Sequence, residues 1–209
     1  AGVLATTYTA SQGLLLMIPS IYKMAGEMLP GVIHVAARSL STHSLSIFGD
    51  HQDVYAASKT GACMLSAASV EEAYHMAMVS HLSSIKSSLP FINFFDGFRT
   101  SHEINKIREI DLSRLETLID KKALKRFRDN GMISGATTRG TAENEDVYFQ
   151  HTESRNGYYT KAIDNVIYYL QKKHSNVVVT PFETVIIMVI SLVTKLLLLW
   201  GQYVNVLRK

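Results

Sequence analysis

The chain has 209 residues, of which 47% are hydrophobic and 19% charged, and its formal net charge is +3. This composition excludes an intrinsically disordered or collagen-like chain, and so mild a positive charge does not by itself indicate nucleic-acid binding. The single cysteine, Cys63, excludes an internal disulfide and a cysteine-ligated iron–sulfur cluster within these residues.

Short apolar segments alternate with longer helical ones over the first 110 residues. Strands are predicted at residues 3–9, 32–37 and 90–95, with a further one at 45–48. Helices are predicted at residues 13–29, 53–65 and 70–84, and Ser69 and Glu72 have the spacing of a capping box for the third. Strands that alternate with helices of this length predict an α/β fold with a doubly wound, mostly parallel sheet.

The second half of the chain is more polar. A charged amphipathic segment covers residues 111–130, a long loop is predicted at 131–156, and a helix at 158–173. The cations of the first segment are Lys121, Lys122, Lys125, Arg126 and Arg128. A solvated helix face explains them better than an anion-binding patch does.

Polar clusters follow three of the predicted strands, at the edge where a parallel sheet binds its ligands. Residues 9–13 carry hydroxyls and a glycine before a helix, which suits an anion or a polarised ring. Arg38 follows the second strand, where its guanidinium can clamp a carboxylate, although an ion pair is the structural alternative. Residues 96–103 form the third cluster, for which turn and helix-cap chemistry is favoured.

Three further features are interpreted as structural. His34 lies within a strand and is expected to be a hydrogen-bonded core histidine. Cys63 lies in a predicted helix and is expected to be buried. Residues 49–53 have the density of a ligand loop, but also that of an ordinary turn followed by a helix N-cap at Gln52 or Asp53.

Several strings in the chain are distinctive. They are YTASQGLLLMIP at 8–19, LSIFGDHQD at 45–53, FFDGFRTSHEI at 94–104, RGTA at 139–142 and YFQ at 148–150. In this order they resemble one family, the pyruvate:ferredoxin (or flavodoxin) oxidoreductases, from about residue 1 to residue 173.

The resemblance implies an oxidoreductase that decarboxylates pyruvate, transfers the acetyl group to coenzyme A and passes electrons through 4Fe–4S clusters to ferredoxin or flavodoxin. Thiamine diphosphate with Mg²⁺ supplies the carbanion chemistry. This stretch is similar to the family's first domain, so the sheet is expected to be of the thiamine-diphosphate-binding type. Because the chain opens at Ala1 and not on Met, that sheet is expected to be incomplete at its N-terminus.

The resemblance also implies roles for individual residues. Arg38 is expected to bind the pyruvate carboxylate, and Thr9, Ser11, Gln12 and Gly13 to form a thiamine-facing loop. No metal ligand is expected among these residues. The family's substrate-binding threonine, its cofactor-activating glutamate, its diphosphate–magnesium site and its cluster cysteines are expected outside this chain, so the piece alone is expected to be inactive.

The complete enzyme is expected to be a homodimer that does not bind nucleic acid. It is expected in the cytoplasm, or in an anaerobic mitochondrion-derived organelle if the source is eukaryotic. A fused relative that is NADP-linked or related to sulfite reductases is the alternative within the same family.

The last residues depart from the resemblance. We expect residues 1–173 to be a partial first domain, 174–182 a linker, and 183–209 an apolar tail that forms a helix. Permitted codons for the tail, read one frame over, spell TIIAMGSVCE, which resembles the start of the family's second domain. This reading favours a reading-frame slip. The rival from another class is a non-catalytic protein that the tail anchors in a membrane, but Lys195 interrupts the apolar run, and inserting it into the membrane costs about 3 kcal/mol.

Overall fold

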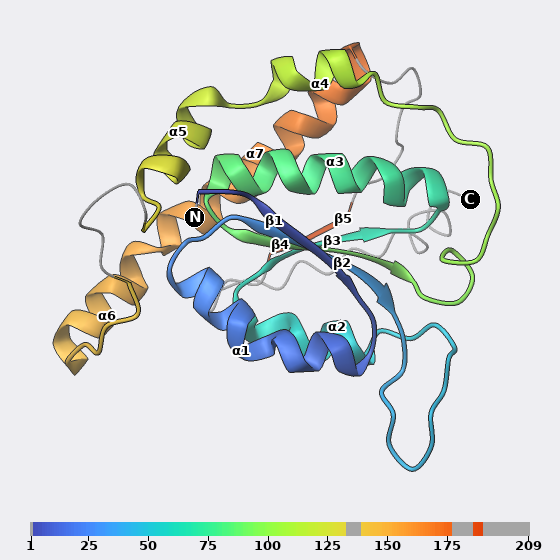
Figure 1. Cartoon of the computed structure of the whole chain (residues 1–209), viewed down its shortest axis with the longest axis horizontal. Coiled ribbons are helices and arrows are strands. Elements are labelled where there is room, and N and C mark those ends of the chain that lie inside the picture. The colour runs from blue at the N-terminus through green and yellow to red at the C-terminus, as the bar shows by residue number, and fades with distance from the viewer. Residues whose placement is uncertain (1, 133–138, 177–185, 190–209) are drawn as a thin grey trace, which may run out of the picture.

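The structure, a computed structural model, describes residues 2–132, 139–176 and 186–189. Its centre is a sheet with the strand order β1-β2-β4-β3-β5 (Figure 1). The strands are β1 (Ala5–Thr9), β2 (Gly31–Ala37), β3 (Cys63–Ala67), β4 (Pro90–Asp96) and β5 (Ile186–Val189). The first four are parallel and β5 pairs antiparallel with β3. The α/β, mostly parallel sheet predicted from the sequence is confirmed.

Helices cover both faces of this sheet (Figure 1). Helices α1 (Gln12–Gly26) and α2 (Gln52–Ala57) pack on one face, around the buried side chains of Ile33 and Val35. Helices α3 (Val70–Ser87) and α7 (Asn156–Asn176) pack on the other. The remaining helices are α4 (Leu112–Leu118), α5 (Lys121–Asp129) and α6 (Glu145–Ser154), with a short 3-10 helix at Ser58–Thr60. Both faces of the central strands are therefore covered, which is why they are almost wholly apolar in sequence.

Helix α3 begins at the capping box that the sequence predicts. The Ser69 hydroxyl accepts a hydrogen bond from the Glu72 amide at 3.2 Å, and the Glu72 carboxylate accepts one from the Ala68 amide at 2.7 Å. Two backbone donors that the first turn leaves without helical partners are thereby satisfied.

Three predicted elements differ from the structure. The predicted helix at 53–65 is wrong in its second half, because Gly61 takes a left-handed φ of +88° and the chain then enters β3, where Cys63 is buried. The predicted strand at 45–48 is a loop whose apolar side chains are exposed. The loop predicted at 131–156 contains α6, which has no buried residue and therefore no apolar periodicity to reveal it.

The chain near its end also differs from the expectation. Residues 186–189 form β5, so at these positions the expected apolar helix is wrong and an antiparallel strand lies beside β3. The other residues of the predicted tail lie outside the described part of the chain. Among the helices of the described ranges, none combines the length and the hydropathy that a membrane crossing requires.

Candidate functional site

The carboxyl ends of β1, β2 and β4 bring the three predicted polar clusters to one edge of the sheet. The Ser11 hydroxyl donates to the Ser39 carbonyl at 2.8 Å, which joins the first cluster to the end of β2. Arg38 Nε donates to the Gly97 carbonyl at 2.9 Å, which joins β2 to the turn after β4. The edge is therefore a single connected surface, as the ligand-binding edge of a parallel sheet requires.

Arg38 is anchored at one side of its guanidinium only. Its side chain is half-buried, and Nε is committed to Gly97. Within the described ranges, Nη1 and Nη2 make no hydrogen bond or ion pair. An arginine keeps its charge across the physiological pH range, so these two nitrogens present four N–H donors and a positive charge at the edge.

The close approach of the two strand ends depends on Gly97. A Cβ atom at this position would lie 2.6 Å from Arg38 Cγ and 2.7 Å from the Ala36 carbonyl oxygen. Only a residue without a side chain lets the Gly97 carbonyl reach the arginine. The orientation of Arg38 is thus built into the backbone of the neighbouring strand.

Residues 9–13 use most of their polar groups within the protein. The Ser11 amide is bonded to a carboxylate and the Gly13 amide donates to the Ala10 carbonyl at 3.0 Å. The one hydrogen of the Ser11 hydroxyl is shared between the Ser39 carbonyl and Gln12 Oε1, and Gln12 Nε2 donates to the Ser41 carbonyl at 2.8 Å. The Thr9 hydroxyl faces Gly13 and makes no hydrogen bond to any described residue. These residues hold the loop after β2, and Thr9 retains an available hydroxyl.

Asp53 supplies the carboxylate beneath this edge, and its position was not predicted from the sequence beyond a helix cap. Its side chain is fully buried, on α2. Oδ2 accepts from the Ser11 amide at 2.8 Å and from the Arg38 amide at 3.2 Å, while Oδ1 accepts from the Val54 amide at 2.7 Å. In the sequence, Asp53 is distinguished by its place in the segment 49–53, whose many polar residues are typical of a ligand loop or of a turn before a helix.

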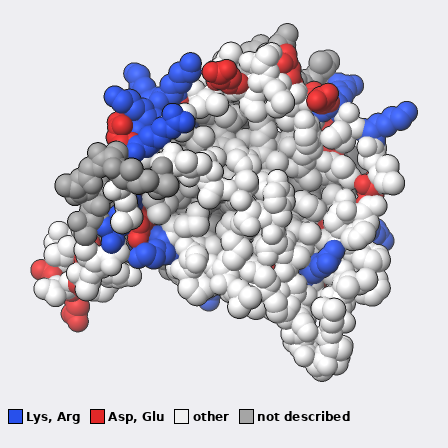
Figure 2. All heavy atoms as spheres, viewed as in Figure 1, with Lys and Arg blue, Asp and Glu red and all other residues white. Residues whose placement is uncertain are grey.

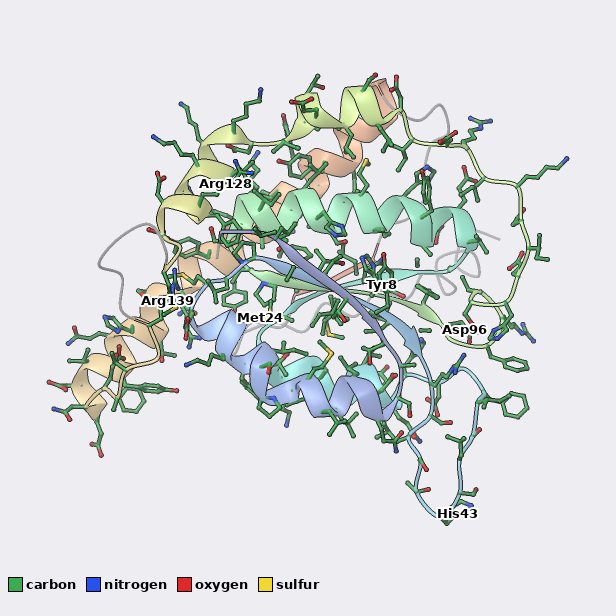
Figure 3. All side chains as sticks on the ribbon, viewed as in Figure 1. Tyr8, Met24, His43, Asp96, Arg128 and Arg139 are labelled. Atoms are coloured by element: carbon green, nitrogen blue, oxygen red, sulfur yellow. The ribbon has the colours of Figure 1, made fainter. Side chains whose placement is uncertain are left out.

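The loop between β2 and α2 projects from the edge, with His43 at its tip (Figure 3). Phe48 is 62% exposed, and its ring lies 4.8 Å from that of Phe98 in the turn after β4. The Ser39 amide donates to the Phe48 carbonyl, which places this aromatic pair next to the segment of Arg38.

The third cluster forms a turn. The Asp96 carboxylate accepts from the amides of Phe98 and Arg99, and His102 Nδ1 lies 3.1 Å from the Phe98 carbonyl. The favoured interpretation of this segment as turn chemistry is confirmed.

His34 lies within β2, four residues before Arg38. It is 4% exposed, Asn93 Nδ2 donates to its Nδ1 at 3.2 Å, and the Tyr8 ring stacks on it at 4.8 Å. Burial, and secondarily the nearby His81, lowers the pKa of His34 to about 4. It is the hydrogen-bonded core histidine that the sequence predicts.

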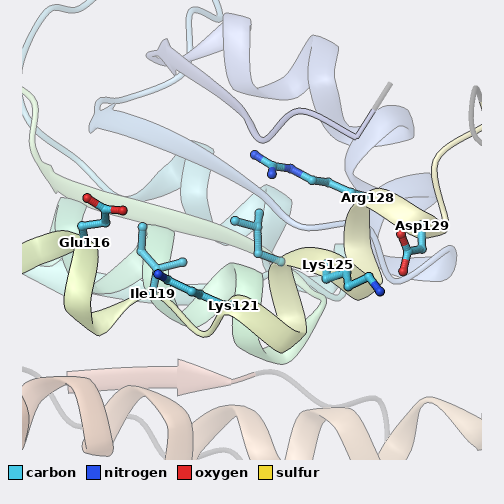
Figure 4. A pocket seen from close by; sticks show the side chains of 7 residues that line it. Glu116, Ile119, Lys121, Lys125, Arg128 and Asp129 are labelled. Atoms are coloured by element: carbon cyan, nitrogen blue, oxygen red, sulfur yellow. The ribbon is translucent and has the colours of Figure 1, made fainter.

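The cations of α5 gather on a different part of the molecule (Figure 2). A hollow of about 360 Å³ lies among them, lined by Glu116, Ile119, Lys121, Leu124, Lys125, Arg128 and Asp129 (Figure 4). Arg126 donates to the Ser88 hydroxyl at 3.3 Å, so part of this charge tethers α5 to the end of α3. Carboxylates line the hollow beside the cations, which favours a solvated face.

No three metal-binding side chains lie together in residues 2–132, 139–176 and 186–189. At the edge, the Nη atoms of Arg38 and the hydroxyl of Thr9 make no hydrogen bond to the described residues. Their chemistry suits a small carboxylate and a polar ring substituent.

Known proteins resemble this chain over the part that contains β1 to β4 and most of α7. The family model described as pyruvate flavodoxin/ferredoxin oxidoreductase, thiamine diphosphate-binding, matches residues 1–169. A pyruvate-flavodoxin oxidoreductase of Enterobacter agglomerans is 55% identical over 173 residues, covering 82% of this chain and 15% of that protein.

Two other relatives differ in the electron acceptor that their names give. A pyruvate:ferredoxin oxidoreductase of Moorella thermoacetica is 57% identical over 160 residues, covering 76% of this chain and 14% of that protein. A mitochondrial NADP(+)-linked pyruvate dehydrogenase of Euglena gracilis is 52% identical over 161 residues, covering 77% of this chain and 9% of that protein. The chain thus spans about 15% or less of the length of these relatives. It belongs to the pyruvate flavodoxin/ferredoxin oxidoreductase family, as part of the thiamine diphosphate-binding domain.

Proposed function

We propose that this chain forms the part of a pyruvate:flavodoxin or pyruvate:ferredoxin oxidoreductase that binds the pyruvate carboxylate and the pyrimidine side of thiamine diphosphate. The observation that carries the proposal is the half-anchored guanidinium of Arg38 at the carboxyl edge of a parallel sheet. The names of the relatives support the reaction, and the family description supports the cofactor.

Arg38 suits a carboxylate because of where its free nitrogens lie. Because Nε is bonded to Gly97, Nη1 and Nη2 are the nitrogens that face the substrate. They can donate two parallel hydrogen bonds to the two oxygens of a carboxylate. Arg38 thereby orients the carboxylate that leaves as carbon dioxide.

The residues at the edge fit the ring side of thiamine diphosphate. The cofactor, when bound, supplies the electron sink that allows the bond to the carboxylate to break. Thr9 has a hydroxyl available for a polar ring substituent, and Ser11, Gln12 and Gly13 shape the loop that carries it. These residues bind and orient, and the chain alone is proposed to be inactive.

The complete enzyme is proposed to add Mg²⁺ at the diphosphate, 4Fe–4S clusters, coenzyme A as acetyl acceptor and a second subunit. Flavodoxin and ferredoxin, named in the relatives, are the proposed acceptors, and the Euglena relative supports an NADP-linked fusion as the second candidate. We place the enzyme in the cytoplasm or, in a eukaryote, in a mitochondrion-derived organelle. Residues 1–173 remain the proposed first domain, followed by a linker at 174–182 and a frame-slipped tail at 183–209.

The proposal is tested by replacing Arg38 in the complete enzyme. We expect Arg38→Ala to lower kcat/KM for pyruvate by a factor that corresponds to a loss of about 2–4 kcal/mol of transition-state stabilisation. This is the scale of a buried charge-assisted pair that loses one partner. Arg38→Lys should recover only part of this loss, because an ammonium does not make the two parallel hydrogen bonds. Steady-state kinetics with a dye acceptor under anaerobic conditions provide the measurement.

The matched control is Arg126→Ala on α5, which removes an arginine that also makes one hydrogen bond but lies on another part of the surface. This variant should keep kcat/KM for pyruvate, and thiamine diphosphate affinity should be nearly unchanged in all three variants. An Arg38→Ala enzyme with the kcat/KM of the parent would contradict the proposed role.

A further inference from the structure

Asp53 is a buried carboxylate whose hydrogen-bond partners are all backbone amides. Its side chain is 0% exposed. The amides belong to three separate segments: Ser11 before α1, Arg38 at the end of β2, and Val54 within α2. In the described ranges Asp53 makes no ion pair, so these three N–H groups are what compensates the burial of the carboxylate.

One oxygen of Asp53 joins the two segments that the proposed function uses. Oδ2 receives both the Ser11 amide at 2.8 Å and the Arg38 amide at 3.2 Å. The chain at Ser11 has a φ of +50°, an unfavourable conformation for a serine, and the bond to Asp53 helps to hold it there. Asp53 Oδ2 therefore bridges the start of α1 and the end of β2, in addition to the bond from the Ser11 hydroxyl to the Ser39 carbonyl.

Arg38 is consequently held at two points along its length. Asp53 fixes the backbone amide, and the Gly97 carbonyl fixes Nε at 2.9 Å. Between these points the side chain has little freedom, so the free edge of the guanidinium faces one direction before a ligand arrives. A positively charged group that is oriented in advance loses less conformational entropy on binding its substrate.

We propose that Asp53 is a positioning residue for the pyruvate carboxylate, which acts by fixing the Arg38 backbone and by coupling it to the thiamine-facing segment at Ser11. This inference rests on the proposed function of Arg38. Recognition of the substrate then depends on the Asp53 carboxylate, although Asp53 does not contact the substrate.

The test is a double-mutant cycle in the complete enzyme, with Asp53→Asn, Arg38→Ala and the combination. Asparagine has the shape of aspartate, but its Nδ2 would face at least one of the three amide donors, so that contact is lost. We expect Asp53→Asn to raise KM for pyruvate and to lower kcat/KM about tenfold or more. In the Arg38→Ala background the same substitution should change kcat/KM less than twofold, because its effect passes through Arg38.

The matched control is Asp120→Asn. Asp120 also accepts from two backbone amides, those of Lys122 and Ala123, but it caps α5 away from the edge. This substitution should lower the melting temperature without changing KM for pyruvate. If Asp53→Asn does not yield folded enzyme, Asp53→Glu, which keeps the charge and moves it by one methylene, takes its place in the cycle.

The outcomes separate the two proposals. Effects of Asp53 and Arg38 that simply add would overturn the positioning role and leave the proposed function standing. A KM for pyruvate that is unchanged in Asp53→Asn would do the same. A normal kcat/KM in Arg38→Ala alone would overturn the proposed function, and this inference with it.

Discussion

His34 is held neutral by the way its two ring nitrogens are surrounded. Asn93 Nδ2 donates to Nδ1, so the proton of the neutral ring lies on Nε2, for which the described residues offer no hydrogen-bond partner. A second proton would have to enter at Nδ1, against an N–H donor and close to His81, whose ring lies 5.4 Å away. Burial, and secondarily the nearby His81, lowers the pKa of His34 to about 4.

The stability of the chain should therefore depend on pH through His34. Above pH 6.5 both the folded and the unfolded chain carry a neutral His34, and the residue contributes no pH dependence. Between pH 6.5 and about 4 the unfolded chain binds the proton and the folded chain does not, so the free energy of unfolding falls by on the order of 3 kcal/mol. Urea unfolding of the full chain at several pH values measures this slope.

His34→Gln should flatten the pH dependence of unfolding in this range. His43→Gln, which removes an exposed histidine at the tip of the loop after β2, is the control and should leave the slope unchanged (Figure 3). Equal slopes in the parent chain and in His34→Gln would show that another group is responsible.

Residue type predicts part of the site and the packing decides the rest. The position of Arg38 directly after a buried strand allows either a structural ion pair or a carboxylate ligand, and the resemblance to the family is what favours the carboxylate. Asp53 is not recognisable from the sequence, because its partners are backbone amides 42 and 15 residues earlier in the chain, and a backbone amide has no signature in sequence. Ser11 and Gln12 were expected to face a ligand, and the structure shows how their polar groups hold the next loop.

At the level of elements, α3 and α6 show two kinds of helix start. Ser69 at the start of α3 accepts a hydrogen bond from the Glu72 amide, whereas Asn144 at the start of α6 makes no such bond with its side chain. Helix α3 packs against β2, β3, β4 and α7, so its stability bears on the whole sheet. Helix α6 has no buried residue.

Ser69→Ala should lower the free energy of unfolding of the chain by about 1 kcal/mol, because the first turn of α3 loses its cap. Asn144→Ala is the matched control: it removes a residue of a preferred capping type that makes no capping bond, and it should cost less than half as much. Urea unfolding followed by circular dichroism compares the two. Equal losses would mean that the hydrogen bond to Glu72 contributes little.

The elements that were predicted wrongly have two different physical causes. Residues 62–65 are apolar and buried on both faces, so strand β3 has no alternation that separates it from a helix, and only Gly61 marks the boundary. Residues 45–48 are apolar but exposed, so their composition resembles a strand that is not there. By contrast β2 and β4, which are also buried, lie between clear glycine and proline signals and were predicted correctly.

On the scale of the whole molecule, the edge that carries Arg38 also exposes apolar side chains. Leu45 and Phe48 are 71% and 62% exposed on the loop after β2, and Figure 2 shows this projecting loop without charge while Lys and Arg gather over α5. An exposed apolar surface beside a binding site is typical of a surface that another part of a protein covers. In the chain alone this apolar surface is exposed beside the half-buried Arg38.

The isolated chain should therefore neither decarboxylate pyruvate nor bind thiamine diphosphate with useful affinity. It spans about 15% of its relatives, and Arg38 without an enclosed site holds a carboxylate only as weakly as an exposed ion pair does. Anaerobic assays with a dye acceptor and calorimetry with thiamine diphosphate provide the measurements. Turnover of pyruvate by the purified 209-residue chain would contradict this expectation.

The strand order has a consequence for how the chain is made. Strand β4 lies between β2 and β3, although β3 precedes it in sequence. A ribosome that adds roughly 5–20 residues per second therefore releases β3 before the strand that joins it to β2 exists. For that interval both strands carry unpaired apolar edges, the condition under which nascent chains stick to one another and chaperones bind. Slow codons between residues 67 and 90 would lengthen the exposure, and synonymous changes there would alter the soluble yield without altering the protein.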